Sequence, residues 1–458
     1  HCVYCAAPRG GSRGSGRPSA ARPVKVAIVG AGWAGTAAAV AACEAGHSVT
    51  VFEASRTLGG RARSLQATLP DGTPVTLDNG QHILIGAYTE TLRLMRMVGV
   101  APDAALLRRP LALPFPDGNG LQTPAYAAQW PAPLDAIAAI ATARGWSWGE
   151  RWSLIRASLG WQWSRFTCAP ALSVAQLCAG MAPRVLRELI EPLCVSALNT
   201  PADQASATVF LRVMQDSLFG VRGGSNLLLP LADLTAIFPG TAAQWITQRG
   251  GQVHVGQRIQ QLRWQEPHWL LDGQAFDRVV WASSSSNAAL ALVESSDTAP
   301  ESIASDLRSW AATTSALRFE AIATVYAWAP QARLPHPMLA LRATPGAPAQ
   351  FVFDRGQLGG PFGLLAFVVS ASAGNREELQ AAVLAQAASE LQPLGLGTLQ
   401  VVQTVVEKQA TFACTPQLQR PRQRIAPDLL AAGDYVAGPY PATLEGAVRS
   451  GWAAGSLP

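Results

Sequence analysis

The chain has 458 residues, of which 49% are hydrophobic and 14% charged, and its formal net charge is +5. Four arginines and no acid lie in residues 1–22, so the rest of the chain carries only 5 − 4 = +1. This excludes a strong basic field over the whole protein, and we expect no nucleic-acid partner. The apolar composition favours large buried surfaces, an apolar ligand or contact with a membrane. The length predicts two domains.

Residues 1–23 are rich in Gly, Ser, Arg and Pro, which predicts a disordered tail. Cys2 and Cys5 form a lone Cys-x-x-Cys pair there, and without a second pair we expect neither a metal centre nor a redox role. The other five cysteines are scattered, which is typical of a reducing cytosol and predicts a cytoplasmic protein.

Residues 24–53 read as an apolar strand, a Gly-x-Gly-x-x-Gly turn, a helix of small residues and a second strand that ends at Glu53. Gly30 permits the tight turn, Gly32 lets the backbone approach a pyrophosphate, and Gly35 lets the helix pack close to the strand. The helix N-terminus offers N–H groups and a positive dipole end to phosphate, and Glu53 is placed to accept hydrogen bonds from a ribose. The segment predicts a dinucleotide site. We interpret its uncharged run, residues 26–43, as part of that site and not as a membrane span.

A second glycine pair, Gly59-Gly60, follows and continues into Arg61. It suits a second approach of backbone to phosphate, with a guanidinium added to the negative charge. A plain nicotinamide site does not need this element. It resembles the second signature of the FAD-binding flavin oxidoreductases related to amine oxidases and phytoene desaturases.

Elements of nucleotide-binding type occur in three separate blocks, which predicts an α/β fold with two interleaved domains. A Rossmann-like FAD-binding domain would comprise 24–105, 217–290 and 416–458, and a mixed α+β substrate-binding domain would comprise 106–216 and 291–415. The expected strands lie at 75–78, 277–282, 321–328, 364–369 and 429–433, with a pair of neighbouring strands in 250–264. The expected helices lie at 89–98 and 377–391 and from residue 442 onward.

The order of these blocks resembles the flavin amine oxidase and phytoene desaturase superfamily over essentially the whole chain after Val24. The sequences of residues 78–82, Asp78-Asn-Gly-Gln-His82, and of residues 441–451 are similar to those of the squalene-associated FAD-dependent desaturases, the hydroxysqualene dehydroxylases of bacterial hopanoid pathways. The resemblance implies a set of FAD-binding positions: Gly30, Gly32, Trp33, Ala34, Gly35, Glu53, Ala54, Gly59, Gly60, Arg61, Gly80, Gln81, His82, Ile259, Gly433, Asp434, Thr443, Leu444 and Ala447. Thr443 replaces the aromatic wall residue of the amine oxidases, and no cysteine lies near the C-terminal flavin segment, which favours a lipid oxidoreductase with non-covalent FAD.

The same resemblance implies a thirty-carbon isoprenoid substrate with one allylic hydroxyl, reduced by hydride from reduced FAD. Hydroxide is a poor leaving group, so a general acid is needed, and a dry apolar tunnel would protect the allylic cation from water. His82 and Asp78 are the catalytic candidates near the flavin, although each residue is also compatible with a purely structural role. The sequence does not identify the donor that re-reduces the flavin.

The sequence is also compatible with two other activities. A carotenoid-type desaturase would run the hydride transfer in the other direction, from a polyene to FAD. A non-catalytic escort of prenylated proteins has the same fold, but the intact Gly59-Gly60-Arg61 and Asp434 argue against it.

Residues 130–166 hold six of the 14 tryptophans. Within the segment 146–166, one face of a predicted helix carries five large apolar side chains: Trp148, Trp152, Ile155, Leu159 and Trp163. This face is either a peripheral contact with the inner membrane or part of the substrate-domain core.

Overall fold

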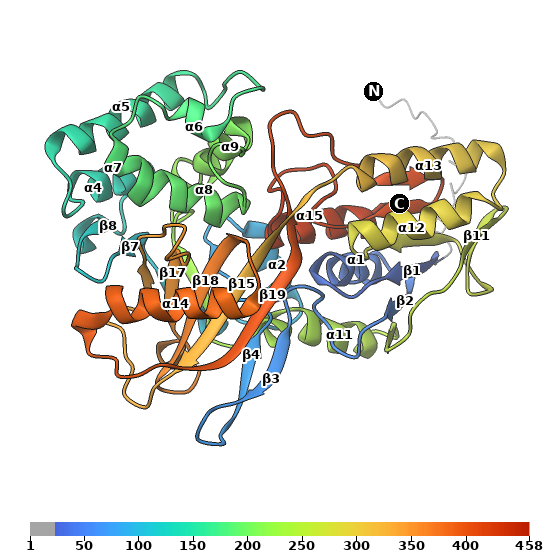
Figure 1. Cartoon of the computed structure of the whole chain (residues 1–458). Helices are drawn as coiled ribbons and strands as arrows, with labels where there is room; N and C mark the ends of the chain where they lie inside the picture. Colours follow the sequence, from blue (N-terminus) through green and yellow to red (C-terminus); the bar gives the residue numbers. More distant parts are fainter. Residues whose placement is uncertain (1–22, 458) are drawn as a thin grey trace, which may run out of the picture.

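The computed structural model describes residues 23–457, so the predictions for the tail and for Cys2 and Cys5 lie outside the described residues. Figure 1 shows two regions side by side. One is built around a mixed six-stranded sheet. The other combines a five-stranded antiparallel sheet with a group of helices. The predicted α/β class is confirmed.

The six-stranded sheet has the order β10-β2-β1-β14-β21-β20, parallel except for the β20–β21 pair at one edge. Its strands come from three distant stretches of the chain: β1 Lys25–Val29, β2 Ser48–Glu53, β10 Gln252–Val255, β14 Arg278–Trp281, β20 Arg424–Ala426 and β21 Leu429–Ala431. Buried strands of this kind read as near-continuous apolar runs, which is why β1, β14 and β21 were recognisable in the sequence.

The helix after β1, α1 (Trp33–Glu44), is apolar all round because it lies between the sheet and the last helix, α15 (Leu444–Gly455). The two helices approach so closely that glycines are required on α15. A Cβ at Gly451 would lie 1.9 Å from the Ala34 carbonyl oxygen, and one at Gly455 would lie 2.1 Å from that of Ala38. The C-terminal helix is thereby fixed against the nucleotide motif, although more than 400 residues separate them along the chain.

The second sheet has the order β16-β17-β18-β15-β19 and is antiparallel throughout. Its strands are β16 Met338–Ala340, β17 Phe351–Asp354, β18 Leu364–Ser372, β15 Phe319–Trp328 and β19 Gln400–Phe412. Side chains alternate between its faces. Val352 packs in the core cluster beneath helix α14 (Arg376–Glu390), whereas Phe351 and Phe353 face the opposite way, into a cavity.

Helices from the middle of the chain lie over one end of this sheet, at the upper left of Figure 1. They are α4 Leu134–Ala141, α5 Trp148–Trp163, α6 Val174–Leu177, α7 Pro183–Val185, α8 Glu191–Leu198 and α9 Ala207–Leu218, with a π-helical turn at Leu186–Ile190. No helix in residues 23–457 combines the length and the apolar character needed to span a bilayer.

The remaining elements connect or flank the two regions. The helices are α2 Thr89–Met97, α3 Pro102–Ala105, α10 Leu234–Ile237, α11 Pro239–Gln248, α12 Ser285–Ser296 and α13 Glu301–Ser315. Small sheets are formed by β3 Ser64–Thr68 with β4 Pro74–Asp78; by β5 Leu84–Ile85 and β6 Leu106–Arg109 on either side of β9 Leu227–Pro230; by β7 Ala112–Pro114 with β8 Gly120–Gln122; and by β11 Leu262–Gln265, β12 His268–Leu271 and β13 Gln274–Phe276.

Two sequence-based expectations need correction. The strands predicted within 250–264 do not pair with each other, because β10 joins the six-stranded sheet and β11 pairs with β12. The domain boundary at 290/291 is also wrong. Helix α13 packs on α12 and β20 of the nucleotide-binding region, and its Trp310 donates a hydrogen bond to the Arg422 carbonyl. The substrate-side region therefore resumes only at β15.

Candidate functional site

A cavity of about 1040 Å³ runs between the two regions and takes wall residues from both. All the predicted cofactor-binding residues except Gly35 lie in its wall. The cavity has two chemically different ends. The polar end is formed by the glycine turns, Glu53, Arg61 and Asp434, and the apolar end by side chains from the second sheet and the helices beside it.

The glycines of the first turn serve different purposes. Gly35 does not line the cavity. It allows α1 to pack closely against the preceding turn, because a Cβ there would lie 1.9 Å from the Gly30 carbonyl oxygen. Gly30 has a φ of +104°, which favours glycine. Gly32 has an ordinary backbone conformation, and a Cβ there would meet only the Gly60 Cα, at 3.8 Å. Its missing side chain therefore leaves the cavity itself open.

The second glycine pair lies against the first. A backbone bridge joins Gly32 to Gly59, and the Gly59 N–H donates to the Ala31 carbonyl over 2.9 Å. Gly60 has a φ of +61° and faces Gly32. Two glycine turns and the N-terminus of α1 thus form one cradle whose backbone N–H groups suit a pyrophosphate.

Glu53 is fixed at the end of β2 by two backbone donors. Its carboxylate accepts from the Ala31 N–H and from the Ser55 N–H, each over 2.7 Å. Each carboxylate oxygen keeps a further lone pair for a hydroxyl donor. Its proposed contact with a ribose stays a prediction.

Arg61 connects the two regions. It forms an ion pair with Asp434 and donates to the Ala410 carbonyl over 2.6 Å, in strand β19 of the second sheet. Asp434 is nearly buried, whereas the Arg61 side chain is about one third exposed. The pair places one positive and one negative group side by side at the polar end, and both residues are among the FAD-binding positions that the resemblance implies.

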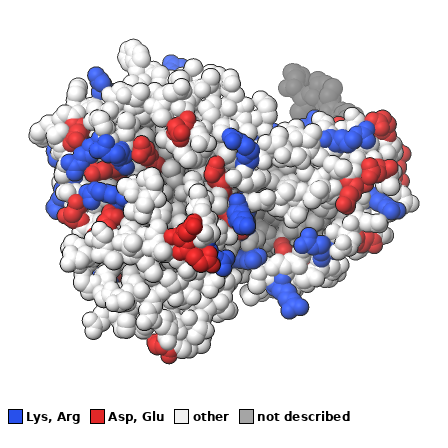
Figure 2. All heavy atoms as spheres, in the orientation of Figure 1, with Lys and Arg blue, Asp and Glu red and all other residues white. Residues whose placement is uncertain are grey.

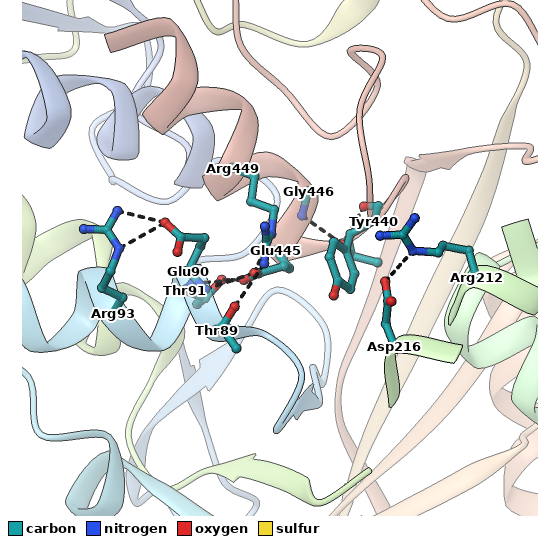
Figure 3. Close-up of polar contacts among 11 residues, drawn as sticks. Thr89, Glu90, Thr91, Arg93, Arg212, Asp216, Tyr440, Glu445, Gly446 and Arg449 are labelled. Carbon is teal, nitrogen blue, oxygen red and sulfur yellow. Dashed lines mark hydrogen bonds and ion pairs between the residues drawn. The ribbon is translucent and has the colours of Figure 1, made fainter. Parts of the chain in front are cut away.

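The N-terminus of α15 forms another part of the wall, with Leu444 and Ala447 in its first turns. The Thr443 hydroxyl accepts from the Gly446 N–H over 3.0 Å and caps the helix. Glu445 is fully buried, and its carboxylate accepts from the Thr91 N–H and hydroxyl at the start of α2. Figure 3 shows this link between the two helices. Glu445 is not among the predicted site residues, because a contact between two helices so far apart in the chain leaves no local pattern.

His82 lies in the cavity wall, on the loop that connects β4 to β5. Its Nδ1 lies 3.0 Å from the Gly80 carbonyl oxygen. A carbonyl can only accept, so Nδ1 carries the proton and the neutral ring keeps a lone pair on Nε2. Burial disfavours the imidazolium and lowers the pKa of His82, and the positive charge of Arg61 acts in the same direction.

Asp78, the other catalytic candidate, is not in the cavity wall. Its carboxylate is buried and accepts from the Leu234 N–H over 2.8 Å, which fixes the end of β4 to α10. Burial raises the pKa of Asp78 to about 6, although the Leu234 N–H and the charge of Arg355 oppose the shift. This position argues against contact with a bound substrate. We assign Asp78 a structural role, in which it holds the end of β4 against α10.

The structure brings two tyrosines to the wall that were not among the predicted site residues. The rings of Tyr88 and Tyr440 meet edge to face, with centroids 6.2 Å apart. Burial, and then the negative charge of Asp216, raise the pKa of Tyr440 to about 12. Asp216 in turn forms an ion pair with Arg212 on α9 (Figure 3). No local pattern predicts this group, because residues 216 and 440 meet only in the folded chain.

The apolar end takes residues from several elements, among them Leu111, Leu113, Leu193, Val213, Met214, Met338, Phe351 and Phe353. Within the part of the chain that the structure describes, no cysteine lines the cavity, and no group of three or more His, Cys, Asp or Glu could hold a metal ion. The arrangement is that of a ligand site that is polar at one end and dry at the other.

The fold and the two-ended cavity define a flavin-dependent oxidoreductase. A family model described as flavin containing amine oxidoreductase matches residues 33–455, and the chain belongs to this family. Solved structures agree on the fold: cyclohexylamine oxidase from Brevibacterium oxydans superposes with a TM-score of 0.66 at 16% identity, over 95% of this chain and 98% of that one.

Among characterised relatives, hydroxysqualene dehydroxylase from Zymomonas mobilis is 25% identical over 450 residues, which cover 94% of this chain and 98% of the relative. The enzyme of that name from Sinorhizobium fredii is 26% identical over 250 residues, 52% of this chain and 55% of the relative. Zeta-carotene desaturase from Synechocystis is 39% identical, but over 18% of this chain and 16% of the relative.

Proposed function

We propose that this flavoenzyme binds FAD without a covalent link and reduces hydroxysqualene to squalene in squalene and hopanoid biosynthesis. The observation that carries the proposal is the continuity of the cavity, which joins a glycine-lined polar end to a long apolar end. A dinucleotide suits the first and an isoprenoid chain the second. Similarity to two hydroxysqualene dehydroxylases, one over nearly full length, supports the choice of substrate.

The residues at the polar end fit FAD. The paired glycine turns leave room for the pyrophosphate, Arg61 supplies positive charge, and the first turn of α15 presents backbone N–H groups at Leu444. When bound in its reduced form, FAD supplies the hydride. The cavity wall has no cysteine in the described part of the chain, which supports non-covalent binding.

The chemistry breaks the allylic C–O bond, forms a C–H bond with two electrons from the reduced cofactor, and releases the hydroxyl as water after it takes up one proton. The apolar walls exclude bulk water from the electron-poor carbon. His82 is the proposed proton donor, and its protonated form delivers the proton to the leaving hydroxyl. Because its pKa is lowered, this form is favoured at acidic pH.

The direct test is anaerobic incubation of the purified protein with hydroxysqualene and FAD, with and without a chemical reductant, followed by mass analysis of the lipid. We expect squalene only with reduced flavin. Absence of squalene from a folded, flavin-loaded protein would contradict the proposal.

A second candidate is a carotenoid-type desaturase, in which hydride passes from a polyene to oxidised FAD. Its support is the short segment similar to zeta-carotene desaturases, and the same cavity would serve both directions. Oxidised enzyme mixed with a phytoene-like polyene tests it, and loss of hydrogen from the polyene would favour this candidate.

We also propose that the protein is cytoplasmic. All five cysteines in residues 23–457 are free, which suits a reducing compartment.

A further inference from the structure

Helix α5 exposes a stripe of large apolar side chains to solvent. Trp148, Trp152, Leu159 and Trp163 are 73%, 60%, 50% and 92% exposed. At about 100° per residue they fall within an arc of about 60° on one side of the helix. Exposed apolar side chains are common singly, but a row of three tryptophans and a leucine on one helix face marks an interaction surface.

The stripe is not needed to attach α5 to the protein. The opposite face of the helix already does so through Leu154, Ser158 and Trp161, which are buried. Trp161 meets Phe210 of α9 edge to face, with ring centroids 6.2 Å apart. The sequence left open whether the tryptophan face belongs to a core, and the structure places it outside.

Positive charge flanks the stripe. Arg151 and Arg156 lie on its two sides along the helix, and Arg165 follows its end. The Arg151 guanidinium lies 4.8 Å from the centroid of the Trp148 ring and donates to two carbonyls of α4 and the following turn. Residues 144–166 contain four arginines and one acid, a net charge of 4 − 1 = +3. Figure 2 shows basic and acidic side chains together at the left edge of the molecule, where Figure 1 places α4, α5 and α7, so the excess of positive charge is a property of the segment 144–166 itself.

The one carboxylate of this segment does not neutralise the arginines. Glu150 accepts from the Ser147 N–H in the capping box that starts α5. Arg156 and Arg165 are exposed, and neither takes part in any ion pair found in residues 23–457. Tryptophans beside unpaired arginines complement the interface of a bilayer that carries anionic headgroups.

The stripe is also linked to the apolar end of the cavity through one contact of its helix. Its helix packs on α9 through Trp161, and α9 contributes Val213 and Met214 to the cavity wall. Helix α5 packs mainly on α4 and α7, and the ring contact between Trp161 and Phe210 joins it to α9. A lipid surface against α5 would therefore be connected to the apolar end of the cavity through α5 and α9.

We propose that α5 binds the surface of an anionic phospholipid bilayer, with its axis in the plane of the interface and Trp148, Trp152, Leu159 and Trp163 inserted at the boundary of headgroups and acyl chains. An amphipathic helix lies in this plane when its apolar face is buried and basic residues meet the headgroups. The binding is independent of which lipid the enzyme converts.

The test is sedimentation of the full-length, FAD-loaded protein with vesicles of phosphatidylcholine alone or mixed with phosphatidylglycerol. The test variant is Trp148→Ser/Trp152→Ser/Trp163→Ser. The matched control, Val221→Ser/Val255→Ser/Phe362→Ser, removes three other exposed apolar side chains outside α5. Arginines in residues 1–22 are common to all three proteins and cannot produce a difference between them.

We expect wild type and control to sediment with mixed vesicles and the tryptophan variant to lose about tenfold or more in partition coefficient, because three inserted rings are removed. Melting temperature and flavin content should be equal in all three proteins, since the changed side chains are exposed. Equal partition of wild type and tryptophan variant, or no sedimentation of wild type with either vesicle, would overturn the proposal.

A second variant tests the charge separately. Arg156→Gln/Arg165→Gln should lose most of the preference for vesicles with phosphatidylglycerol while binding pure phosphatidylcholine as the wild type does. Added salt should reduce the preference of the wild type in the same way. A preference for phosphatidylglycerol that survives the two substitutions and the added salt would show that Arg156 and Arg165 do not meet the headgroups, and it would contradict the proposed part of charge in the binding.

Discussion

The two ends of the cavity differ in how tightly their residues are determined. At the polar end, backbone packs closely against backbone, so particular positions accept only glycine. At the apolar end, many side chains of similar volume would serve, because the requirement is only that the wall be dry and filled. The polar end can therefore be predicted from the sequence, whereas the residues of the apolar end can be identified only in the folded structure. The two ends should also respond independently to mutation.

Gly32→Val should have the largest effect, confined to the polar end. The new side chain meets no backbone closely and projects into the cradle, so the fold should persist while FAD affinity falls about a thousandfold. Fluorescence titration of FAD measures the affinity, and the melting temperature of the cofactor-free protein should stay within a few degrees of wild type. Gly160→Ala, at an open position on α5, is the control and should bind FAD normally.

His82→Gln removes the proposed proton donor, so kcat should fall by about a hundredfold. The kcat of the wild type should fall as pH rises through a pKa below the ordinary 6.5 of histidine, because the protonated ring is the active form. The variant should lose this dependence. A pH profile equal to that of the wild type would remove His82 from the mechanism.

Met214→Gln should affect only the apolar end. The side chain keeps its length but places an amide in a dry wall, so KM for the lipid should rise about tenfold at unchanged FAD affinity. A matching loss of FAD affinity would contradict the separation of the two ends.

Asp78→Asn should have the smallest effect and should involve neither end. The folded-state pKa of about 6 lies above the ordinary value, so the carboxyl favours the folded state below about pH 4, and this contribution is lost as pH rises through 6. At pH 7 to 8 the variant should be about 1 to 2 kcal/mol more stable than wild type in urea titrations, with kcat within about twofold. A large fall in kcat would restore Asp78 as a catalytic residue.

The parts of the site that the sequence predicted follow the same division. Gly30, Gly35 and the strand ending at Glu53 could be assigned because turn geometry and strand periodicity are local. The sequence predicts helix α15 as an element. Its close packing on α1 requires glycine at 451 and 455, and this requirement is evident only once the two helices are seen in contact.

Other contacts could not be predicted because they join distant segments. Tyr440 meets Asp216, and Glu445 caps α2, through the packing of elements hundreds of residues apart. The boundary after residue 290 was misplaced for a similar reason, since the amphipathic pattern of α13 does not say which domain it packs on.

In the proposed reaction, one cavity brings reduced FAD and an isoprenoid alcohol together. The most direct measurement is a single-turnover experiment in which reduced, FAD-loaded protein is mixed anaerobically with hydroxysqualene, while the return of oxidised-flavin absorbance and the formation of squalene are followed together. We predict that both appear at the same rate in wild type and more slowly in Met214→Gln. Flavin that stays reduced with hydroxysqualene, in a protein whose oxidised flavin is reduced by a phytoene-like polyene, would contradict the dehydroxylase proposal and favour the desaturase.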